Sequence, residues 1–214
     1  MSAFFGSTHR HFQDEHGTRK LADRLEDLAH PAFEARDRDF IQGVSMVFIS
    51  TVDGQGRPTV SYKGGAPGFV RVTGPSELVF PNYDGNGMFL TLGNIAESAQ
   101  VGLLFIDFER PHRLRVQGRA ELSNDHALLG LYPGADYVVR VTTSQIFVNC
   151  GRYIHRNAGS TPSPHVPDPR GRQPFPAWKR LDLFEGALPA PDARRVDEAG
   201  GMIPIEAYPG EDGA

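Results

Sequence analysis

Residues 44–64 read VSMVFISTVDGQGRPTVSYKG, and this stretch decides the fold class. Its first part, Val44–Val52, is rich in β-branched and aromatic residues, as is typical of a strand. The DGQG sequence at residues 53–56 predicts a hairpin turn, because glycine readily adopts a positive φ. Thr59–Lys63 then alternates with a period of two. The stretch therefore predicts two antiparallel strands joined by a tight turn.

Working outward, the same kind of pattern recurs along the chain. Five further strands are predicted, at Gly68–Thr73, Glu77–Pro81, Gln100–Phe108, Arg113–Leu122 and Tyr137–Val148. One helix, Gly87–Ala99, interrupts them. Short strands at regular spacing favour a mainly β fold, an antiparallel barrel with flanking helices, over a doubly wound sheet. Val44–Val52 and Val101–Phe108 are apolar on both faces, so helices or a second subunit must cover the outside of the barrel.

Two flanking regions differ in character from the barrel. In residues 1–43 we expect a helical extension, in which Leu21, Leu25 and Leu28 form one apolar stripe. A second helix is expected from Pro31, carrying Phe33, Phe40 and Ile41 and ending at Gly43. Residues 44–154 form the predicted barrel domain. Residues 155–214 are expected to be a Pro/Gly-rich arm, with a short strand or helix at Trp178–Leu183 and a loosely held end from Pro189.

Composition excludes several classes of protein. The net charge of -4 over 214 residues gives no broad basic footprint for nucleic acid or an anionic membrane. Cys150 is the only cysteine, so no internal disulfide forms. The apolar stretches are too short to cross a bilayer, and the first ten residues lack the apolar core of a signal peptide. We expect a cytoplasmic protein without nucleic-acid or membrane partners.

Thr59–Lys63 also carries the most informative side chains. Alternation places Thr59, Ser61 and Lys63 on one face of the strand and Val60 and Tyr62 on the other. Two hydroxyls and an ammonium group, followed by glycines that allow close approach to the backbone, suit a phosphate or another anion. The alternative interpretation is a solvated strand face that ends in a turn.

The segment NYDGNG at residues 82–87 directly precedes the predicted helix. Asn86 is expected to cap that helix by accepting a bond from its first turn. The same helix end offers free N–H donors and the positive end of the helix dipole, so anion binding is a second hypothesis for this segment.

The strand at residues 112–122 places Arg113, Arg115, Gln117 and Arg119 on one face. Three guanidinium groups in a row need water, carboxylates or a ligand to offset their repulsion. Two interpretations of this face remain open: it lies in solvent on the outside of the barrel, or it faces a ligand. His9, His11 and His16 match no metal-ligand spacing and are expected to be surface residues, so no metal site is predicted.

Together these segments resemble the pyridoxamine 5'-phosphate oxidase-like FMN-binding family. The resemblance runs from about Phe40 to Ile154, and its motifs are Gly56-Arg57-Pro58, Ser61-Tyr62-Lys63-Gly64, Pro67-Gly68-Phe69-Val70, Asp84-Gly85-Asn86-Gly87-Met88, Leu92-Gly93-Asn94-Ile95, Val101–Phe108, Arg113–Gly118 and Asn149–Ile154.

The resemblance implies a six-stranded split barrel that forms a homodimer and holds FMN in a groove between the subunits. It implies phosphate contacts from the strand around Ser61, Tyr62 and Lys63 and from the segment entering the helix, including Asn86, Gly87 and Thr91. It implies a contact to the flavin ring from Arg113, with Arg115 as a further candidate. Arg113 and Arg115 would then neutralise the reduced flavin near N1.

An FMN-dependent oxidoreductase acting on an unidentified small-molecule substrate is therefore the leading hypothesis. The absence of an acid–base constellation agrees with it, because a bound flavin carries the electrons. A non-catalytic FMN carrier or redox sensor and a haem-binding split barrel are the alternatives. The pyridoxamine 5'-phosphate oxidases that the chain resembles carry an Arg-x-His pair near the C-terminus. In this chain the pair is Arg110-Pro111-His112, which lies before a barrel strand. This departure argues against vitamin B6 oxidation.

Overall fold

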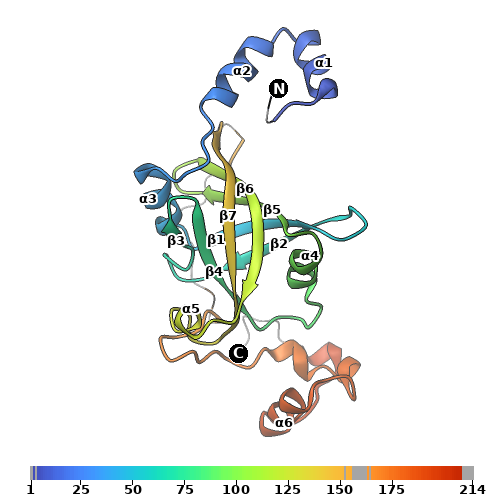
Figure 1. Cartoon of the computed structure of the whole chain (residues 1–214). Helices are drawn as coiled ribbons and strands as arrows, with labels where there is room; N and C mark the ends of the chain where they lie inside the picture. Colours follow the sequence, from blue (N-terminus) through green and yellow to red (C-terminus); the bar gives the residue numbers. More distant parts are fainter. Residues whose placement is uncertain (1, 3, 152, 156–162, 164, 209–214) are drawn as a thin grey trace. The chain divides into compact units, whose positions relative to one another are not determined.

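The computed structural model describes residues 2, 4–151, 153–155, 163 and 165–208. Contacts within the chain divide it into two compact units, Met1–Pro162 and Ser163–Ala214, and each is described by itself. The first unit is a curled β-sheet with helices around it (Figure 1). Residues 156–162, on the C-terminal side of the predicted domain boundary at 154, lie outside the described residues.

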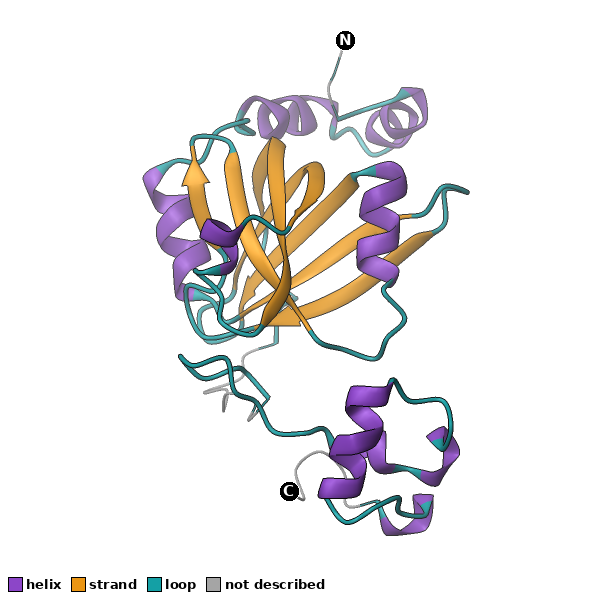
Figure 2. Ribbon diagram, turned by 60° about the horizontal axis from the view of Figure 1, so that its bottom comes forward, coloured by secondary structure: helices purple, strands orange, loops and turns teal. Residues whose placement is uncertain are grey.

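Seven strands form one antiparallel sheet in the order β2-β1-β5-β6-β7-β4-β3. The strands are β1 (Met46–Val52), β2 (Pro58–Gly64), β3 (Arg71–Gly74), β4 (Glu77–Tyr83), β5 (Gln100–Asp107), β6 (His112–Ser123) and β7 (Ala135–Asn149). The sheet curls into the split barrel drawn in Figure 2. The mainly β prediction is confirmed, and the observed sheet has one strand more than the six that the family resemblance implies.

The hairpin at residues 53–57 forms as the sequence predicts. The N–H of Asp53 donates to the carbonyl of Arg57 at 3.1 Å, and Gly56 takes a φ of 82°. The Asp53 carboxylate accepts from the N–H groups of Gln55 and Arg57, both at 2.9 Å. The turn fixes the register of β1 on β2, in which Ile49 is opposite Ser61 and Val47 is opposite Lys63. This register determines on which face of the sheet each side chain of β2 lies, independently of any ligand.

Alternation along the strands builds the core inside the barrel. Val47 and Ile49 of β1 are buried, and Phe80 of β4 and Phe105 of β5 are the largest fully buried side chains. Where β6 crosses β7 the register shifts between Gln117 and Gly118. A Cβ atom at Gly118 would lie 2.2 Å from the carbonyl oxygen of Thr142, so only glycine fits this close approach.

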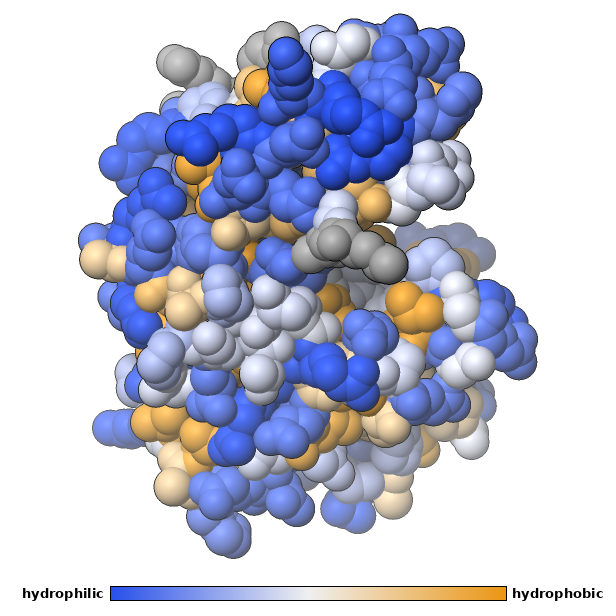
Figure 3. All heavy atoms as spheres, turned by 45° about the horizontal axis from the view of Figure 1, so that its top comes forward, coloured by the Kyte–Doolittle hydropathy of each residue, from blue (hydrophilic) through white to orange (hydrophobic). Residues whose placement is uncertain are grey.

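The other face of β2, β1 and β5 carries apolar side chains that the described part of the chain leaves at least partly uncovered. We call this surface the outer apolar face, and its members are Met46, Phe48, Val60, Tyr62, Leu104 and Ile106. Register places Phe48 between Tyr62 and Leu104, and Val60 is 67% exposed. On the face drawn in Figure 3, hydrophilic side chains predominate and apolar ones form small separate patches.

The N-terminal region forms three helices, α1 (Ser7–Glu15), α2 (Arg19–Asp27) and α3 (Ala35–Gly43). Arg10 of α1 pairs with Asp23 of α2 at 2.6 Å, which ties the first two together. The predicted leucine stripe lies on α2 and is exposed. Among the described residues, no helix has the length and hydropathy needed to cross a bilayer.

The expected helix start at Pro31 is wrong, because α3 begins at Ala35. Residues 30–33 instead form a non-helical strap bonded to the sheet. His30 exchanges two backbone hydrogen bonds with Ile146 of β7, at 3.1 and 2.8 Å, and the N–H of Phe33 donates to the carbonyl of Pro75 at 2.6 Å. The end of α3 at Gly43 agrees with the prediction.

Two helices interrupt the strands. Helix α4 (Leu90–Ser98) lies between β4 and β5, and α5 (His126–Leu129) lies between β6 and β7. The sequence predicts α4 three residues too early, at Gly87, and does not predict α5. Asp125 caps α5, since its side chain accepts from the N–H groups of Ala127 and Leu128.

The described residues of the second unit form three 3₁₀ turns, η1 (Ala177–Arg180), η2 (Asp182–Phe184) and η3 (Ile205–Ala207), and one helix, α6 (Ala190–Glu198). Lys179 is buried and pairs with Asp192 at 2.9 Å. Of the two structures expected at Trp178–Leu183, a short strand or a short helix, the helical one forms, as the 3₁₀ turns η1 and η2. The expectation of a loosely held end from Pro189 is wrong for 190–198, because α6 forms there and buries Val196.

Candidate functional site

Strand β2 and the segment that leads into α4 enclose a pocket of about 290 Å³. Six residues singled out from the sequence line it: Ser61, Tyr62, Lys63, Asn86, Gly87 and Thr91. The remaining lining residues are Asn82, Tyr83, Asp84, Gly85, Met88, Phe89, Leu90, Leu92 and Asp136. Segments that are distant in sequence thus meet in one hollow.

Alternation along β2 separates the polar side chains from the apolar ones. Ser61 and Lys63 are partly buried, whereas Val60 and Tyr62 are exposed on the other face. The Tyr62 ring packs edge-on against Phe48 at a centroid distance of 5.8 Å, on the outer apolar face. Ser61 and Lys63 therefore offer their polar groups on the side of β2 that faces α4.

Three hydrogen bonds hold α4 against β1 and β2. The Asn94 Nδ2 donates to the Thr51 Oγ1 at 2.9 Å, and both residues are buried. The Ser98 hydroxyl donates to the carbonyl of Val52 at 2.6 Å. At the other end of the helix, the Thr91 hydroxyl donates to that of Ser61 at 3.2 Å. These bonds fix the helix N-terminus beside Ser61.

The loop before α4 takes an unusual backbone conformation. Gly87 has a φ of 76°, and Phe89, the residue that precedes the helix, has a φ of 53°. The prediction that Asn86 caps the helix is wrong. Its Oδ1 accepts from the N–H of Met88 at 3.1 Å, a local turn three residues too early for the cap position. A left-handed Phe89 is sterically costly, and such residues gather at functional sites.

The N-terminus of α4 consequently carries no side-chain cap. Its first backbone bond runs from the N–H of Gly93 to the carbonyl of Phe89 at 2.8 Å. The N–H groups of the first turn have no acceptor within the helix and point along its axis away from the helix. They lie at the pocket, since Leu90, Thr91 and Leu92 line it. A helix end of this kind attracts anions.

Lys63 supplies the positive charge of the pocket. Its ammonium group is more than half withdrawn from water, and this burial lowers the pKa of Lys63 below its ordinary value. It makes no hydrogen bond or ion pair with any residue that the structure describes. A partly buried cation without an ion pair is unfavourable, and an anion bound next to it in the pocket would offset the cost.

Another part of the wall combines the start of the 82–87 segment, which the sequence singled out, with Asp136, which it did not. Asn82 and Tyr83 come from the end of β4, and Asp136 comes from the start of β7. They meet because β4 and β7 pair, with Asn82 opposite Tyr137. Burial raises the pKa of Tyr83, so its hydroxyl is protonated and can donate a hydrogen bond at neutral pH. No local motif marks Asp136; only the strand pairing could have found it.

Arg113 and Arg115 do not reach this pocket. They lie on the outward side of β6, where Arg113 is opposite Ile106 and Arg115 is opposite Leu104 of the outer apolar face. Neither forms an ion pair with a residue that the structure describes. The Nε of Arg113 is buried and has no hydrogen-bond partner among those residues. The strand of arginines thus borders the outer apolar face.

A second hollow, of about 520 Å³, lies between α3 and the turn from β5 to β6. Its lining includes Phe40, Val44, Met46 and Ile106 and the acidic residue Asp39. It contains none of the residues predicted to bind the cofactor. Because it lacks a hydroxyl–ammonium cluster and an open helix end, the smaller pocket remains the better anion site.

A sequence model described as pyridoxamine 5'-phosphate oxidase matches residues 33–167, which is more than half of the chain. The chain belongs to this family. Among curated proteins no match is found.

Three solved structures resemble the family domain of this chain. HupZ of Group A Streptococcus is 21% identical, with 59% of this chain and 99% of that chain covered and a TM-score of 0.46. HutZ, the haem storage protein from Vibrio cholerae, is 21% identical, with 55% and 94% covered and a TM-score of 0.40. A FAD-binding protein from Mesorhizobium loti is 13% identical, with 56% and 96% covered and a TM-score of 0.40.

Within the family domain, Arg110 and His112 lie outside the pocket. The Arg110 Nε bonds to the Asp107 carboxylate at 3.3 Å, and the His112 ring packs edge-on against Phe40 at 4.7 Å. This Arg-x-His sequence belongs to the turn from β5 to β6 and its packing against α3.

Proposed function

We propose that the pocket between β2 and α4 binds FMN through its phosphate. One observation carries the proposal: the half-buried Lys63 makes no ion pair within the described chain, and it lines the same pocket as a helix N-terminus without a side-chain cap. A phosphate dianion would accept bonds from both, and charge-assisted bonds of this kind are the strong ones. The residues present therefore fit the phosphate end of the cofactor.

Each residue has a distinct part in this proposal. Lys63 supplies the charge, the hydroxyls of Ser61 and Thr91 donate hydrogen bonds, and Gly87 lets the loop approach the ligand closely. Asn86 holds the loop through its bond to the N–H of Met88. When bound, FMN supplies hydride and single-electron transfer, and the protein positions it.

The proposal includes a homodimer in which a second copy covers the outer apolar face. Val60 and Tyr62 are exposed there, and apolar side chains clustered on a sheet face favour burial against a partner. Arg113 and Arg115 border that face and are not part of their own chain's pocket. In this proposal Arg113 and Arg115 contact the flavin ring only where the second copy places them next to the cofactor.

The activity that we propose is that of an FMN-dependent oxidoreductase acting on a small-molecule substrate. The pocket wall contains a tyrosine and carboxylates but no paired nucleophile and base, which agrees with chemistry carried by the cofactor. A carrier or sensor would use the same phosphate site without a second substrate.

The test starts from the absorption spectrum of freshly purified protein. We expect a two-banded flavin spectrum, and FMN in the supernatant after denaturation. A Soret band, or a colourless protein that does not bind added FMN, would refute the proposal. Steady turnover with NADH or NADPH and an electron acceptor would support an oxidoreductase. A single stoichiometric reduction would support a carrier instead.

A further inference from the structure

The helical hairpin α1–α2 buries none of its side chains in its own chain. No residue of either helix is buried, and both helices lie outside the barrel (Figure 1). The leucines of the predicted stripe, Leu21, Leu25 and Leu28, are 60%, 53% and 57% exposed. Short helices are marginal in water unless an apolar face packs on something. The hairpin therefore lacks the surface that such a stripe ordinarily covers.

Helix α2 packs on α1 with its charged face. Arg10 of α1 pairs with Asp23 at 2.6 Å and with Glu26 at 3.6 Å. At about 3.6 residues per turn, these two acidic residues lie on the side of α2 roughly opposite the leucine stripe. An amphipathic helix usually buries its apolar stripe and exposes its charged face. In this hairpin the arrangement is reversed, and the leucines point away from α1.

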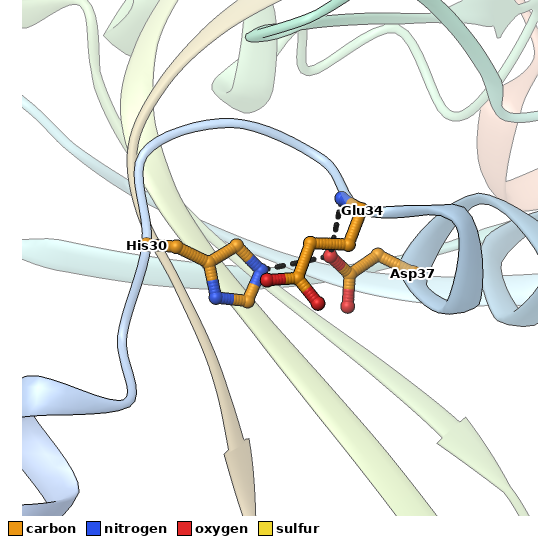
Figure 4. A group of neighbouring side chains, drawn as sticks. All are labelled: His30, Glu34 and Asp37. Carbon is orange, nitrogen blue, oxygen red and sulfur yellow. Dashed lines mark hydrogen bonds and ion pairs between the residues drawn. The ribbon is translucent and has the colours of Figure 1, made fainter.

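The hairpin is held next to β7 at both of its ends. Before α1, the Phe4 ring packs edge-on against Phe147 of β7 at a centroid distance of 5.0 Å. After α2, the His30 ring bonds to the Asp37 carboxylate of α3 at 2.8 Å (Figure 4). The His30 backbone also pairs with Ile146 of β7. These contacts determine where the leucine stripe is presented.

The hairpin also adjoins the outer apolar face. Strand register gives one row of neighbouring side chains across the outside of the sheet from β2 to β7, consisting of Tyr62, Phe48, Leu104, Arg115 and Phe147. Phe4, which leads into α1, packs against the last member of this row. A second copy that covers the outer apolar face would therefore reach the hairpin at the edge of the same surface.

We propose that the leucine stripe of α2 packs against a second copy of this chain, so that the α1–α2 hairpin is part of the homodimer interface. This inference rests on the homodimer of the proposed function. It adds an interface element that lies outside the matched family domain at residues 33–167. Apolar residues at i, i+4 and i+7 are the pattern with which a helix anchors itself on an apolar partner surface.

The charges of α2 favour a protein partner over a membrane. Residues 19–27 contain equal numbers of basic and acidic side chains, namely Arg19, Lys20 and Arg24 against Asp23, Glu26 and Asp27. Helices that lie in a membrane surface are rich in Lys and Arg on the polar face, which attracts anionic lipids. The balanced charge of α2 gives no such attraction.

The experiment compares Leu25→Glu with Lys20→Glu, which introduces the same side chain at an exposed position of α2 off the stripe. Sedimentation of the full chain over a dilution series gives the dissociation constant of the dimer. We expect Leu25→Glu to raise this constant at least roughly tenfold, because an unpaired charge would have to be buried at the interface. Lys20→Glu should dissociate as the wild type does.

A second measurement needs no variant to fold. In the wild type, amide hydrogen exchange in residues 19–28 should slow as the protein concentration rises and the dimer forms. Exchange that is independent of concentration would overturn the proposal. A Leu25→Glu dimer as tight as that of Lys20→Glu would also overturn it.

The remaining outcomes separate the hairpin from the other parts of the proposed function. If Val60→Glu weakens the dimer and Leu25→Glu does not, the outer apolar face stays in the interface and the hairpin is excluded from it. A wild-type monomer would overturn the homodimer as well, whereas the flavin spectrum tests the cofactor pocket separately. An unchanged Leu25→Glu dimer that no longer sediments with phosphatidylserine vesicles, when the wild type does, would assign the stripe to a membrane instead.

Discussion

The hydroxyl of Thr91, in the first turn of α4, donates to the hydroxyl of Ser61 on β2 at 3.2 Å. This contact joins the open helix end to the strand that carries Lys63, so both anion-attracting features occur in one pocket. The Ser61 hydroxyl still has its own proton to donate, and the Thr91 hydroxyl can rotate to donate to a ligand instead. The following predictions start from this arrangement.

Lys63→Ala should weaken FMN binding by at least about 1.5 kcal/mol, roughly tenfold, because it removes a charge-assisted bond. Fluorescence quenching of FMN during titration measures the affinity. Lys20→Ala, on the exposed surface of α2, is the matched control and should bind normally. Equal affinities in the two variants would exclude Lys63 from the site.

FMN affinity should depend on pH on both sides of neutrality. Burial lowers the pKa of Lys63 below its ordinary value of 10.5, and affinity should fall as pH rises through that lowered pKa, since the neutral amine no longer attracts the phosphate. Below about pH 6 the phosphate ester becomes a monoanion and affinity should fall again. The same titration repeated across pH checks this. Lys63→Ala should lose the alkaline decline only; a decline that persists in this variant contradicts the assignment.

Gly118→Ala should destabilise the barrel by about 3 kcal/mol, because the new methyl group meets backbone that cannot move aside. The added Cβ would lie 2.2 Å from the Thr142 carbonyl oxygen, whereas at Gly102 the nearest atom is the Ser50 Cβ at 4.0 Å. Gly102→Ala is therefore the control. Urea unfolding of both variants gives the comparison, and similar midpoints would show that the β6–β7 crossing tolerates a side chain.

Val60→Glu should shift the proposed homodimer toward monomers, because it puts a charge into the outer apolar face. Light scattering coupled to size-exclusion chromatography measures the mass. Leu183→Glu makes the same kind of change at an exposed apolar residue of the second unit and should leave the mass unchanged. A wild-type monomer, or a Val60→Glu dimer of undiminished stability, would remove the outer face from the interface.

Local sequence pattern predicted the fold well where one signal dominated. The alternation of Thr59–Lys63 assigned its faces correctly, because a hairpin turn with Gly56 fixed the register. The pattern misplaced the start of α4. Asn86 has the chemistry of a cap, but the left-handed Phe89 delays the helix, and no rule predicts that conformation at a phenylalanine.

The rest of the site depended on contacts distant in sequence. Asp136 joins the pocket through the pairing of β4 with β7, which no local motif encodes. For Arg115, alternation gave the right strand face, but not that the neighbours on that face are the apolar residues of β5. Periodicity predicts which side chains share a face and leaves open what that face meets.

Phe89 also determines how this protein would respond to engineering. Glycine adopts a left-handed backbone without the steric cost of about 1–2 kcal/mol that other residues incur. Phe89→Gly should therefore raise the melting temperature, the reverse of the usual effect of glycine inside a helix. Selecting variants for heat resistance alone would therefore favour loss of the Phe89 ring from the pocket wall.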